Sequence, residues 1–194
     1  LHAARCLARL GMEELVLTGR RGLQTPGAAD AVEELEALGT RVVVIAADVC
    51  VEADVLRVAA AATCPVRMVL HTAGTLDDTP LVELDDSGIA SMLAPKVRGA
   101  RLLAAHVDTE LLVFYSSLSG AMGGAGQVHY AAANAWLDAF AVALTQSGRS
   151  VSSIGWGPWE IGMAAGSDLS RVGLHSWNAD GAAQVLGVVL GSSE

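Results

Sequence analysis

Short runs of apolar, β-branched residues alternate along the chain with longer amphipathic stretches. The apolar runs predict five strands, at 13–20, 41–49, 67–74, 110–117 and 149–156. The stretches between them predict helices at about 29–38, 52–62, 83–106 and 129–146. Such alternation is typical of βαβ units, in which helices cover both faces of a parallel sheet. We therefore expect one α/β domain over residues 1–194, a doubly wound, Rossmann-like parallel sheet with strand order like 3-2-1-4-5-6.

The two ends of the sequence have helical patterns. The chain opens on "LHAARCLARLG", in which Leu1, Cys6, Leu7 and Leu10 can share a face and Gly11 ends the helix. It closes just after the helix-like segment "AAQVLGVVL". Because a helix precedes the first predicted strand, we expect that strand to be the second of the fold. A chain truncated at both ends, without the first strand and the Gly-rich phosphate loop, would be inactive by itself and marginally stable.

Composition narrows the class of protein. Of the 194 residues 52% are hydrophobic and 17% charged, which indicates a globular chain. The net charge of −9 and scattered arginines argue against a nucleic-acid surface. No apolar run approaches the ~20 residues that span a bilayer, and no secretory leader is visible, so we expect a cytoplasmic protein without membrane contact. Cys6, Cys50 and Cys64 are too scattered for a disulfide framework or a metal site, and we expect them reduced and buried.

Polar residues fall where the predicted strands end. Arg20 and Arg21 end the first strand, Asp48 the second, "HTAG" (71–74) the third and "SS" (116–117) the fourth. In open parallel sheets the ligand lies at the carboxyl ends of the strands. This agreement predicts a ligand site at that edge.

The stretch "QVHYAAANAW" (127–136) places Asn134 four residues after Tyr130. A tyrosine, whose ordinary pKa is about 10, needs a nearby cation to transfer protons at neutral pH. Lys96 is the only lysine of the chain. The residues alone leave two interpretations open: a catalytic tyrosine served by this lysine, or a packed tyrosine with Lys96 as a solvated surface charge.

Six motifs in order resemble the short-chain dehydrogenase/reductase superfamily and, more specifically, the ketoreductase domain of modular type I polyketide synthases. They are "LTGRRG" (17–22), "ADV" (47–49), "HTAGTLDD" (71–78), "LAPKVRGA" (93–100), "YSSLSGAMGGAGQVHYAAANAWLDAFA" (115–141) and "GWGPW" (155–159). In these ketoreductases the lysine and the asparagine exchange places relative to other short-chain dehydrogenases. The resemblance therefore favours Lys96 as the cation and explains Asn134.

The resemblance implies NADPH-dependent reduction of a β-ketoacyl thioester on an acyl carrier protein, with neighbouring synthase domains in the same polypeptide. Tyr130 would be the general acid, and the Lys96 ammonium would help its proton leave. Ser117, 13 residues before Tyr130, would hydrogen-bond the substrate oxygen. Asn134, one helical turn after Tyr130, would order Lys96 or a proton-relay water. His129 is more readily explained as a bystander.

The resemblance also implies residues for the cofactor NADPH. Arg20 and Arg21 stand where an NAD enzyme holds its ribose with an acidic residue, and guanidinium groups there favour the 2′-phosphate. A solvated arginine loop is the alternative. The remaining cofactor residues would be Asp48 and Val49 at the adenine, and Thr72, Ala73 and Gly74 where the backbone approaches the cofactor.

On the substrate side, Leu76, Asp77 and Asp78 resemble the LDD fingerprint of B-type ketoreductases, which form the D-configured β-hydroxyl. Met122 stands where A-type domains carry tryptophan. The segment 160–174 resembles the mobile lid of these domains, and Trp159 and Met163 would contact the acyl chain. Two alternatives stay open: a free-standing short-chain reductase, and a catalytically silent structural or interaction module of a synthase.

Overall fold

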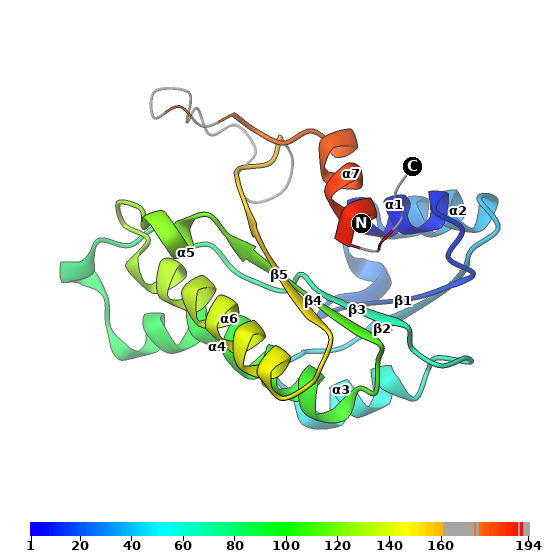
Figure 1. Ribbon diagram of the computed structural model, residues 1–194, viewed down its shortest axis with the longest axis horizontal. Helices are drawn as coiled ribbons and strands as arrows, with labels where there is room; N and C mark the ends of the chain where they lie inside the picture. The colour runs from blue at the N-terminus through cyan, green and yellow to red at the C-terminus, as the bar shows by residue number, and fades with distance from the viewer. Residues whose placement is uncertain (161–172, 174, 190, 192–194) are drawn as a thin grey trace.

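The computed structural model describes residues 1–160, 173, 175–189 and 191 (Figure 1). The strands are β1 (Glu14–Gly19), β2 (Arg41–Ala46), β3 (Met68–His71), β4 (Leu111–Ser117) and β5 (Val151–Trp156). The helices are α1 (His2–Arg9), α2 (Ala28–Ala37), α3 (Glu52–Ala59), α4 (Asp86–His106), α5 (Ser119–Met122), α6 (Val128–Gln146) and α7 (Ala179–Val189), with 3-10 turns at Gly22–Gln24 and Leu81–Glu83. The predicted α/β class is confirmed, and the strands are shorter than expected mainly at their carboxyl ends.

All strand pairs of the described residues are parallel. One ladder joins β1 to β2, and a second has the order β3-β4-β5. Within the described part of the chain β1 and β3 belong to these two separate ladders. This is the arrangement that the order 3-2-1-4-5-6 gives when β1 is its second strand and β3 its fourth.

Helices cover both faces of the sheet, as the sequence predicts. Figure 1 shows α1, α2 and α7 on one side and α3, α4 and α6 on the other. Leu112, Val113 and Phe114 of β4 are fully buried. Because successive strand residues point to opposite faces, three buried in a row mean that β4 is covered on both sides. The largest core cluster joins Phe114 to Leu137 of α6 and Ala100 of α4.

The ends of two helices show how local residues define them. Gly11 has φ +83° and ends α1, as expected. The Asp85 side chain accepts a hydrogen bond from Gly88 N at 2.7 Å, so α4 begins at Asp86 and not at residue 83. The expected apolar face of α1 is wrong in part, since Leu1 and Leu10 are 49% and 45% exposed. The face that packs against the domain consists of Ala4, Cys6, Leu7 and Ala8.

The expectation of three buried cysteines is also wrong in part. Cys6 is buried, but Cys50 is half-buried and Cys64 is exposed, because Cys64 lies in the loop between α3 and β3. Among the described residues, no cluster of three His, Cys, Asp or Glu side chains could hold a metal ion. In the same part of the chain, no helix combines the length and the apolar character needed to cross a membrane.

Candidate active site

The side chains of Lys96 and Tyr130 lie close to each other near the carboxyl end of β4. Lys96 is only 4% exposed, and its Nζ donates a hydrogen bond to the Tyr115 carbonyl at 2.8 Å. The same Nζ lies 5.9 Å from the centre of the Tyr130 ring. The solvated-charge alternative for Lys96 is therefore wrong, because the side chain is buried between α4, α6 and β4.

Burial and one carboxylate set the charge of Lys96. Burial lowers the pKa of Lys96 to about 8, and the Asp138 carboxylate opposes this by raising it. Lys96 is thus mainly protonated at neutral pH and loses its proton within reach of ordinary assay conditions.

A short series of hydrogen bonds joins α6 to the end of β4. Asn134, which is fully buried, donates from Nδ2 to the Tyr130 carbonyl at 2.8 Å. Ser116 Oγ donates to the Asn134 carbonyl at 3.2 Å. The expected link from the Asn134 amide to Lys96 is not among the hydrogen bonds of the described residues, and Asn134 Oδ1 is buried without a partner there. Ser116 is the contact that sequence reasoning missed.

Ser117 ends β4 on the same side of the site. Its Oγ accepts a hydrogen bond from Ser119 N at 3.2 Å, which starts the short helix α5. A Cβ on Gly120 would lie 3.0 Å from Ala135 N, so α5 packs directly on α6 one residue after Asn134. The turn that follows Ser117 is therefore held against the helix that carries Tyr130.

The predicted arginine pair lies at the carboxyl ends of β1 and β2. Gly19 and Ala46 are the last partners of that ladder, so Arg20 follows directly beyond it. Arg20, Arg21 and Thr25 line a hollow of about 570 Å³. Gly22 has φ +49°, and a Cβ there would lie 3.0 Å from the Ala46 backbone. The absence of a side chain at Gly22 thus lets the arginine loop fold onto β2.

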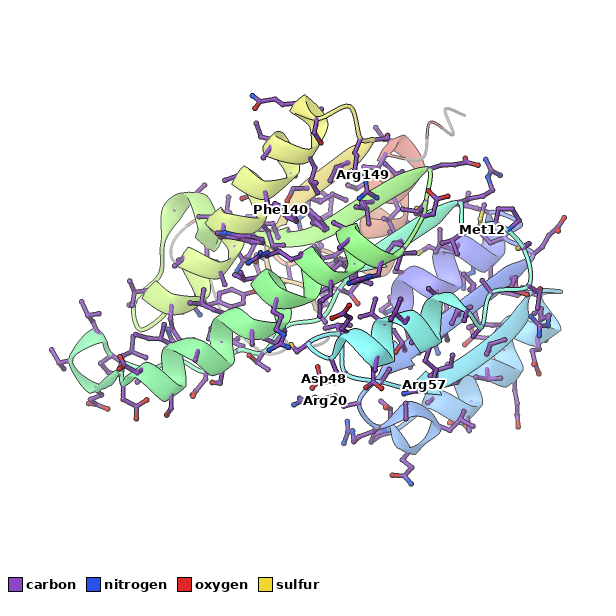
Figure 2. The ribbon with its side chains drawn as sticks, turned by 90° about the horizontal axis from the view of Figure 1, so that it is seen from below. Met12, Arg20, Asp48, Arg57, Phe140 and Arg149 are labelled. Carbon is purple, nitrogen blue, oxygen red and sulfur yellow. The ribbon has the colours of Figure 1, made fainter. Side chains whose placement is uncertain are left out.

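Asp48 stands at the same edge, next to Arg20 in Figure 2. β2 ends at Ala46, so "ADV" is a turn and not the strand end that we expected. Asp48 Oδ1 accepts from Cys50 N at 2.8 Å, and Asp48 N donates to Asp54 Oδ2 at 2.8 Å. Burial, followed by Asp48, raises the pKa of the Cys50 thiol to about 11, against the effect of Arg98 and Arg20. The thiol is therefore not a nucleophile at neutral pH.

Arg98 of α4 acts on the same Cys50 thiol as Arg20, which makes it a third cation of this edge that the sequence did not indicate. The neighbouring Val49 is half-buried and packs on α4, since a Cβ on Gly99 would come within 2.8 Å of its Cγ2.

The segment after β3 lies against Lys96. Thr72 is exposed, whereas Ala73 and Gly74 are half-buried. A Cβ on Gly74 would lie 3.2 Å from Lys96 Cε and 3.5 Å from its Nζ. Gly74 therefore leaves room for the lysine, in addition to the predicted approach to a cofactor. His71 is 2% exposed, and burial lowers the pKa of its imidazole to about 4.

The LDD segment is fixed to the loop that precedes Tyr130. Gln127 Nε2 donates to Asp78 Oδ1 at 2.9 Å, and Thr79 N donates to the Gly126 carbonyl at 2.9 Å. Leu76 is half-buried and Asp77 exposed. Two segments 49 residues apart in sequence are thus joined beside the candidate acid.

Met122 and Trp159 differ in their surroundings: Met122 is exposed to solvent, whereas Trp159 packs against another tryptophan. Met122 ends α5 and is 69% exposed. The Trp159 ring is 4.8 Å from the buried Trp156 ring. Trp177 N donates to the Pro158 carbonyl at 2.7 Å, and Glu160 N donates to the Trp177 carbonyl at 3.0 Å. Met163 and most of the predicted lid lie outside the described residues.

Comparison with known proteins identifies the family of the chain. The family described as "KR domain" matches residues 1–161. The chain is 41% identical over 185 residues to polyketide synthase GfsB of Streptomyces halstedii and 42% identical over 192 residues to erythronolide synthase EryA3 of Saccharopolyspora erythraea. These alignments cover 92% and 95% of the chain but only 3% and 6% of the two relatives.

Solved structures show the same likeness. A ketoreductase from the first module of phoslactomycin biosynthesis in Streptomyces sp. HK803 superposes with a TM-score of 0.89 at 34% identity, over 95% of this chain and 46% of its own. An A-type ketoreductase from a modular polyketide synthase superposes with a TM-score of 0.91 at 36% sequence identity. This alignment covers 100% of the present chain and 42% of the ketoreductase chain. A C2-type ketoreductase superposes with a TM-score of 0.84 at 34% sequence identity, over 98% of this chain and 43% of its own. Overall similarity of fold therefore does not distinguish A-type from C2-type ketoreductases.

Proposed function

The chain belongs to the KR domain family of modular polyketide synthases, and from this premise we propose that it reduces the β-keto group of an acyl thioester to a β-hydroxyl group. The observation that carries the proposal is the buried Lys96 ammonium, 5.9 Å from the centre of the Tyr130 ring. In this proposal the ammonium stabilises the negative charge that the Tyr130 side chain carries once it has given up its proton. Residues 1–194 act in this proposal as one catalytic domain.

Each residue of the cluster has one task. Ser117 donates a hydrogen bond to the ketone oxygen, where negative charge develops. Tyr130 gives its proton to that oxygen, and Lys96 stabilises the phenolate that remains. Asn134 holds the Tyr130 turn of α6 through the hydrogen bond to its carbonyl. NADPH, when bound, supplies the hydride that the β-carbon accepts, so that hydride and proton together make the alcohol.

Arg20 and Arg21, at the carboxyl ends of β1 and β2, form what we call the arginine edge, and we assign the 2′-phosphate end of NADPH to it. The hollow of about 570 Å³ beside Arg20 and Arg21 is open to two guanidinium groups, which bind phosphate in a bidentate manner. Asp48 and Val49 border the adenine in this proposal, and Thr72, Ala73 and Gly74 border the cofactor farther along the edge. Replacing both arginines by serine should weaken NADPH binding far more than NADH binding. Equal losses for both nucleotides would contradict the assignment.

The substrate is proposed to arrive on an acyl carrier protein, with neighbouring synthase domains in the same polypeptide. The length of the relatives supports this, because the aligned region is a small fraction of each.

We assign the product the D configuration, that of B-type domains. The contact of Asp78 with Gln127 supports a role for Leu76, Asp77 and Asp78 beside the acid, and Met122 replaces the tryptophan of A-type domains. Reduction of a diketide thioester followed by chiral chromatography tests this; an L-hydroxyl product would contradict it.

The test of the reaction itself is Tyr130→Phe in the synthase polypeptide that contains the domain. We expect NADPH consumption with a β-ketoacyl thioester to stop while NADPH affinity stays close to that of the unmodified protein. Turnover retained in Tyr130→Phe would remove the tyrosine from its role. NADPH binding without reduction by the unmodified protein would instead favour a catalytically silent module.

A further inference from the structure

Ser116 is a polar side chain on an otherwise apolar face of β4. Successive strand residues alternate between the two faces of a sheet, so Ser116 shares its face with Leu112 and Phe114. On this face Phe114 belongs to the core cluster that contains Leu137 of α6, the helix beside β4 in Figure 1. Ser116 is only 5% exposed. The proposed reaction gives this buried hydroxyl no task, although Ser116 directly precedes Ser117.

The Ser116 hydroxyl is bonded to the turn of α6 that carries the candidate acid. Its Oγ donates to the Asn134 carbonyl at 3.2 Å, and Asn134 Nδ2 donates to the Tyr130 carbonyl at 2.8 Å. A carbonyl inside a helix accepts the N–H group four residues later, and its oxygen has a second lone pair for a further donor. The Ser116 hydroxyl therefore joins β4 to α6 without replacing a bond of the helix.

The short helix α5 contacts the same peptide group of α6. A Cβ on Gly120 would lie 3.0 Å from Ala135 N and 3.2 Å from Asn134 C, so Gly120 lies directly against the Asn134–Ala135 peptide group. The first residue of α5 is Ser119, whose N donates to Ser117 Oγ at 3.2 Å. The end of β4 and the helix that follows it thus both contact one peptide group beside the Tyr130 turn.

The two contacts differ in what they resist. Packing against Gly120 stops α5 and α6 from approaching each other, but single van der Waals contacts oppose separation only weakly. A hydrogen bond weakens steeply when its distance or angle changes, so the bond from Ser116 opposes displacement in every direction. Ser116 is therefore the contact that keeps the Asn134 turn from moving along or away from β4.

We propose that Ser116 is a positioning residue, whose hydrogen bond sets the spacing between Ser117 on β4 and Tyr130 on α6. Both hydroxyl groups must reach one ketone oxygen, so a small shift of α6 relative to β4 misplaces one donor. Ser116 itself touches none of the reacting atoms. The inference rests on the proposed function for its consequence in catalysis, whereas the hydrogen bond can be tested without it.

The hydrogen bond is measurable in the 194-residue chain without any assay of activity. The asparagines of the sequence are Asn134 and Asn178, so asparagine labelled with 13C at its backbone carbonyl gives two signals. Ser116→Ala removes the donor and should shift the Asn134 signal, while Asn178, just before α7, should keep its position. Ser116→Thr keeps a hydroxyl and should return the Asn134 signal close to its original place. An unmoved signal in Ser116→Ala would show that Ser116 does not bond this carbonyl, and would overturn the proposal.

The consequence for catalysis is measured in the synthase polypeptide that contains the domain. Ser116→Ala should lower kcat about tenfold, the cost of a small misplacement of a catalytic group, while KM for NADPH and for the thioester stays unchanged. Ser116→Thr should recover most of the lost kcat. Full kcat in Ser116→Ala would overturn the proposal. If that variant does not fold, Ser116→Cys replaces it, since a thiol is a weak donor of similar size, and full kcat in Ser116→Cys has the same meaning.

Thr40→Val is the matched control for loss of stability. Thr40 is 3% exposed, and its Oγ1 donates to the Met12 carbonyl at 2.9 Å, at the amino end of β2 and thus at the edge of the sheet opposite to Ser117. Both substitutions remove a buried hydroxyl that donates to a backbone carbonyl, so they should lower the melting temperature to a similar extent. Thr40→Val should keep its kcat. An equal loss of kcat in Thr40→Val would attribute the effect of Ser116→Ala to stability alone and reject the positioning role.

A double substitution tests whether Ser116 acts through Ser117. In Ser117→Ala one of the two donors to the ketone oxygen is gone, so the added change Ser116→Ala should lower the residual kcat little further. Losses that multiply in the double variant would show that Ser116 does not act through this spacing. Absence of turnover in the unmodified protein would reject the proposed function, and with it the role of Ser116 in catalysis, and leave the NMR result standing.

Discussion

Lys96 donates its hydrogen bond to the Tyr115 carbonyl while its ammonium faces the ring of Tyr130, 5.9 Å from the ring centre. One backbone contact thus holds the buried Lys96 ammonium over the ring of Tyr130. The arrangement is expensive for the folded state, because burial lowers the pKa of Lys96 from 10.5 to about 8. Function and stability are therefore expected to oppose each other at this residue.

Lys96→Met should abolish reduction and stabilise the domain. The lowered pKa means that the folded state disfavours the ammonium by about 3 kcal/mol at neutral pH. Loss of the hydrogen bond to the Tyr115 carbonyl destabilises the variant by about 1 kcal/mol in the opposite direction. We expect a net gain of about 2 kcal/mol by urea unfolding at pH 7. Between pH 8 and 10.5 the lysine is protonated in the unfolded state but largely neutral in the folded state. The unmodified protein therefore gains stability as the pH rises through this range, and the stability difference between Lys96→Met and the unmodified protein becomes smaller.

Arg98→Met is the control for this prediction, since it removes an exposed cation from the same helix. It should change stability by no more than about 0.5 kcal/mol. If Lys96→Met were less stable than the unmodified protein at pH 7, the charge at Lys96 would not be the costly element that its burial indicates.

Gly74→Ala should displace the Lys96 side chain without any change to the sequence of α4. The added Cβ would lie 3.2 Å from Lys96 Cε, a contact that the flexible side chain can relieve only by moving away from its place. We expect a shifted signal of the single lysine in the NMR spectrum and a loss of kcat of about tenfold, the cost of a small misplacement of a catalytic group. Gly19→Ala is the control, because a Cβ at Gly19 meets nothing within 4 Å. Equal spectra for both variants would show that Gly74 does not define the lysine position.

Sequence patterns predicted the elements that carry the site because each signal is local. Alternation of β-branched runs with amphipathic stretches predicted β1 to β5 and the helices α2, α3, α4 and α6, whereas the four-residue helix α5 was not predicted. The spacing of Tyr130 and Asn134 needs only one helical turn. The pairing of Lys96 with Tyr130 was predicted through the family motif. Composition alone would have placed a lone lysine on the surface.

The remaining features depend on contacts between distant segments. Trp177 donates a backbone hydrogen bond to Pro158, and Gln127 donates a side-chain hydrogen bond to Asp78. No local sequence pattern predicts either bond, because the partners are far apart along the chain. A helical pattern likewise does not tell which part of α1 is covered, which is why Leu1 and Leu10 are exposed.

His71 should make the domain sensitive to acid. Its imidazole is 2% exposed and burial lowers its pKa from 6.5 to about 4, so the unfolded state binds a proton in this window that the folded state does not. Stability is complete above pH 6.5 and falls as pH drops toward 4, by about 3 kcal/mol from this group. His71→Leu should flatten that part of the stability curve in urea titrations between pH 7 and 4. The exposed His175, changed to Leu, serves as control and should keep the slope, and a slope retained in His71→Leu would exclude His71 as its source.

Gly22→Ala should destabilise the arginine edge for two separable reasons. Gly22 has φ +49°, which an alanine adopts at a cost of about 1 kcal/mol, and the new Cβ would lie 3.0 Å from the Ala46 backbone, which cannot turn aside as a side chain can. Gly27→Ala carries the first cost alone, since Gly27 has φ +73° with nothing within 4 Å of a Cβ. We therefore expect thermal unfolding to show a larger loss for Gly22→Ala than for Gly27→Ala, and NADPH affinity to fall only in the former, because its loop carries Arg20 and Arg21. Equal losses of stability in the two variants would mean that the contact with Ala46 does not hold the loop in place.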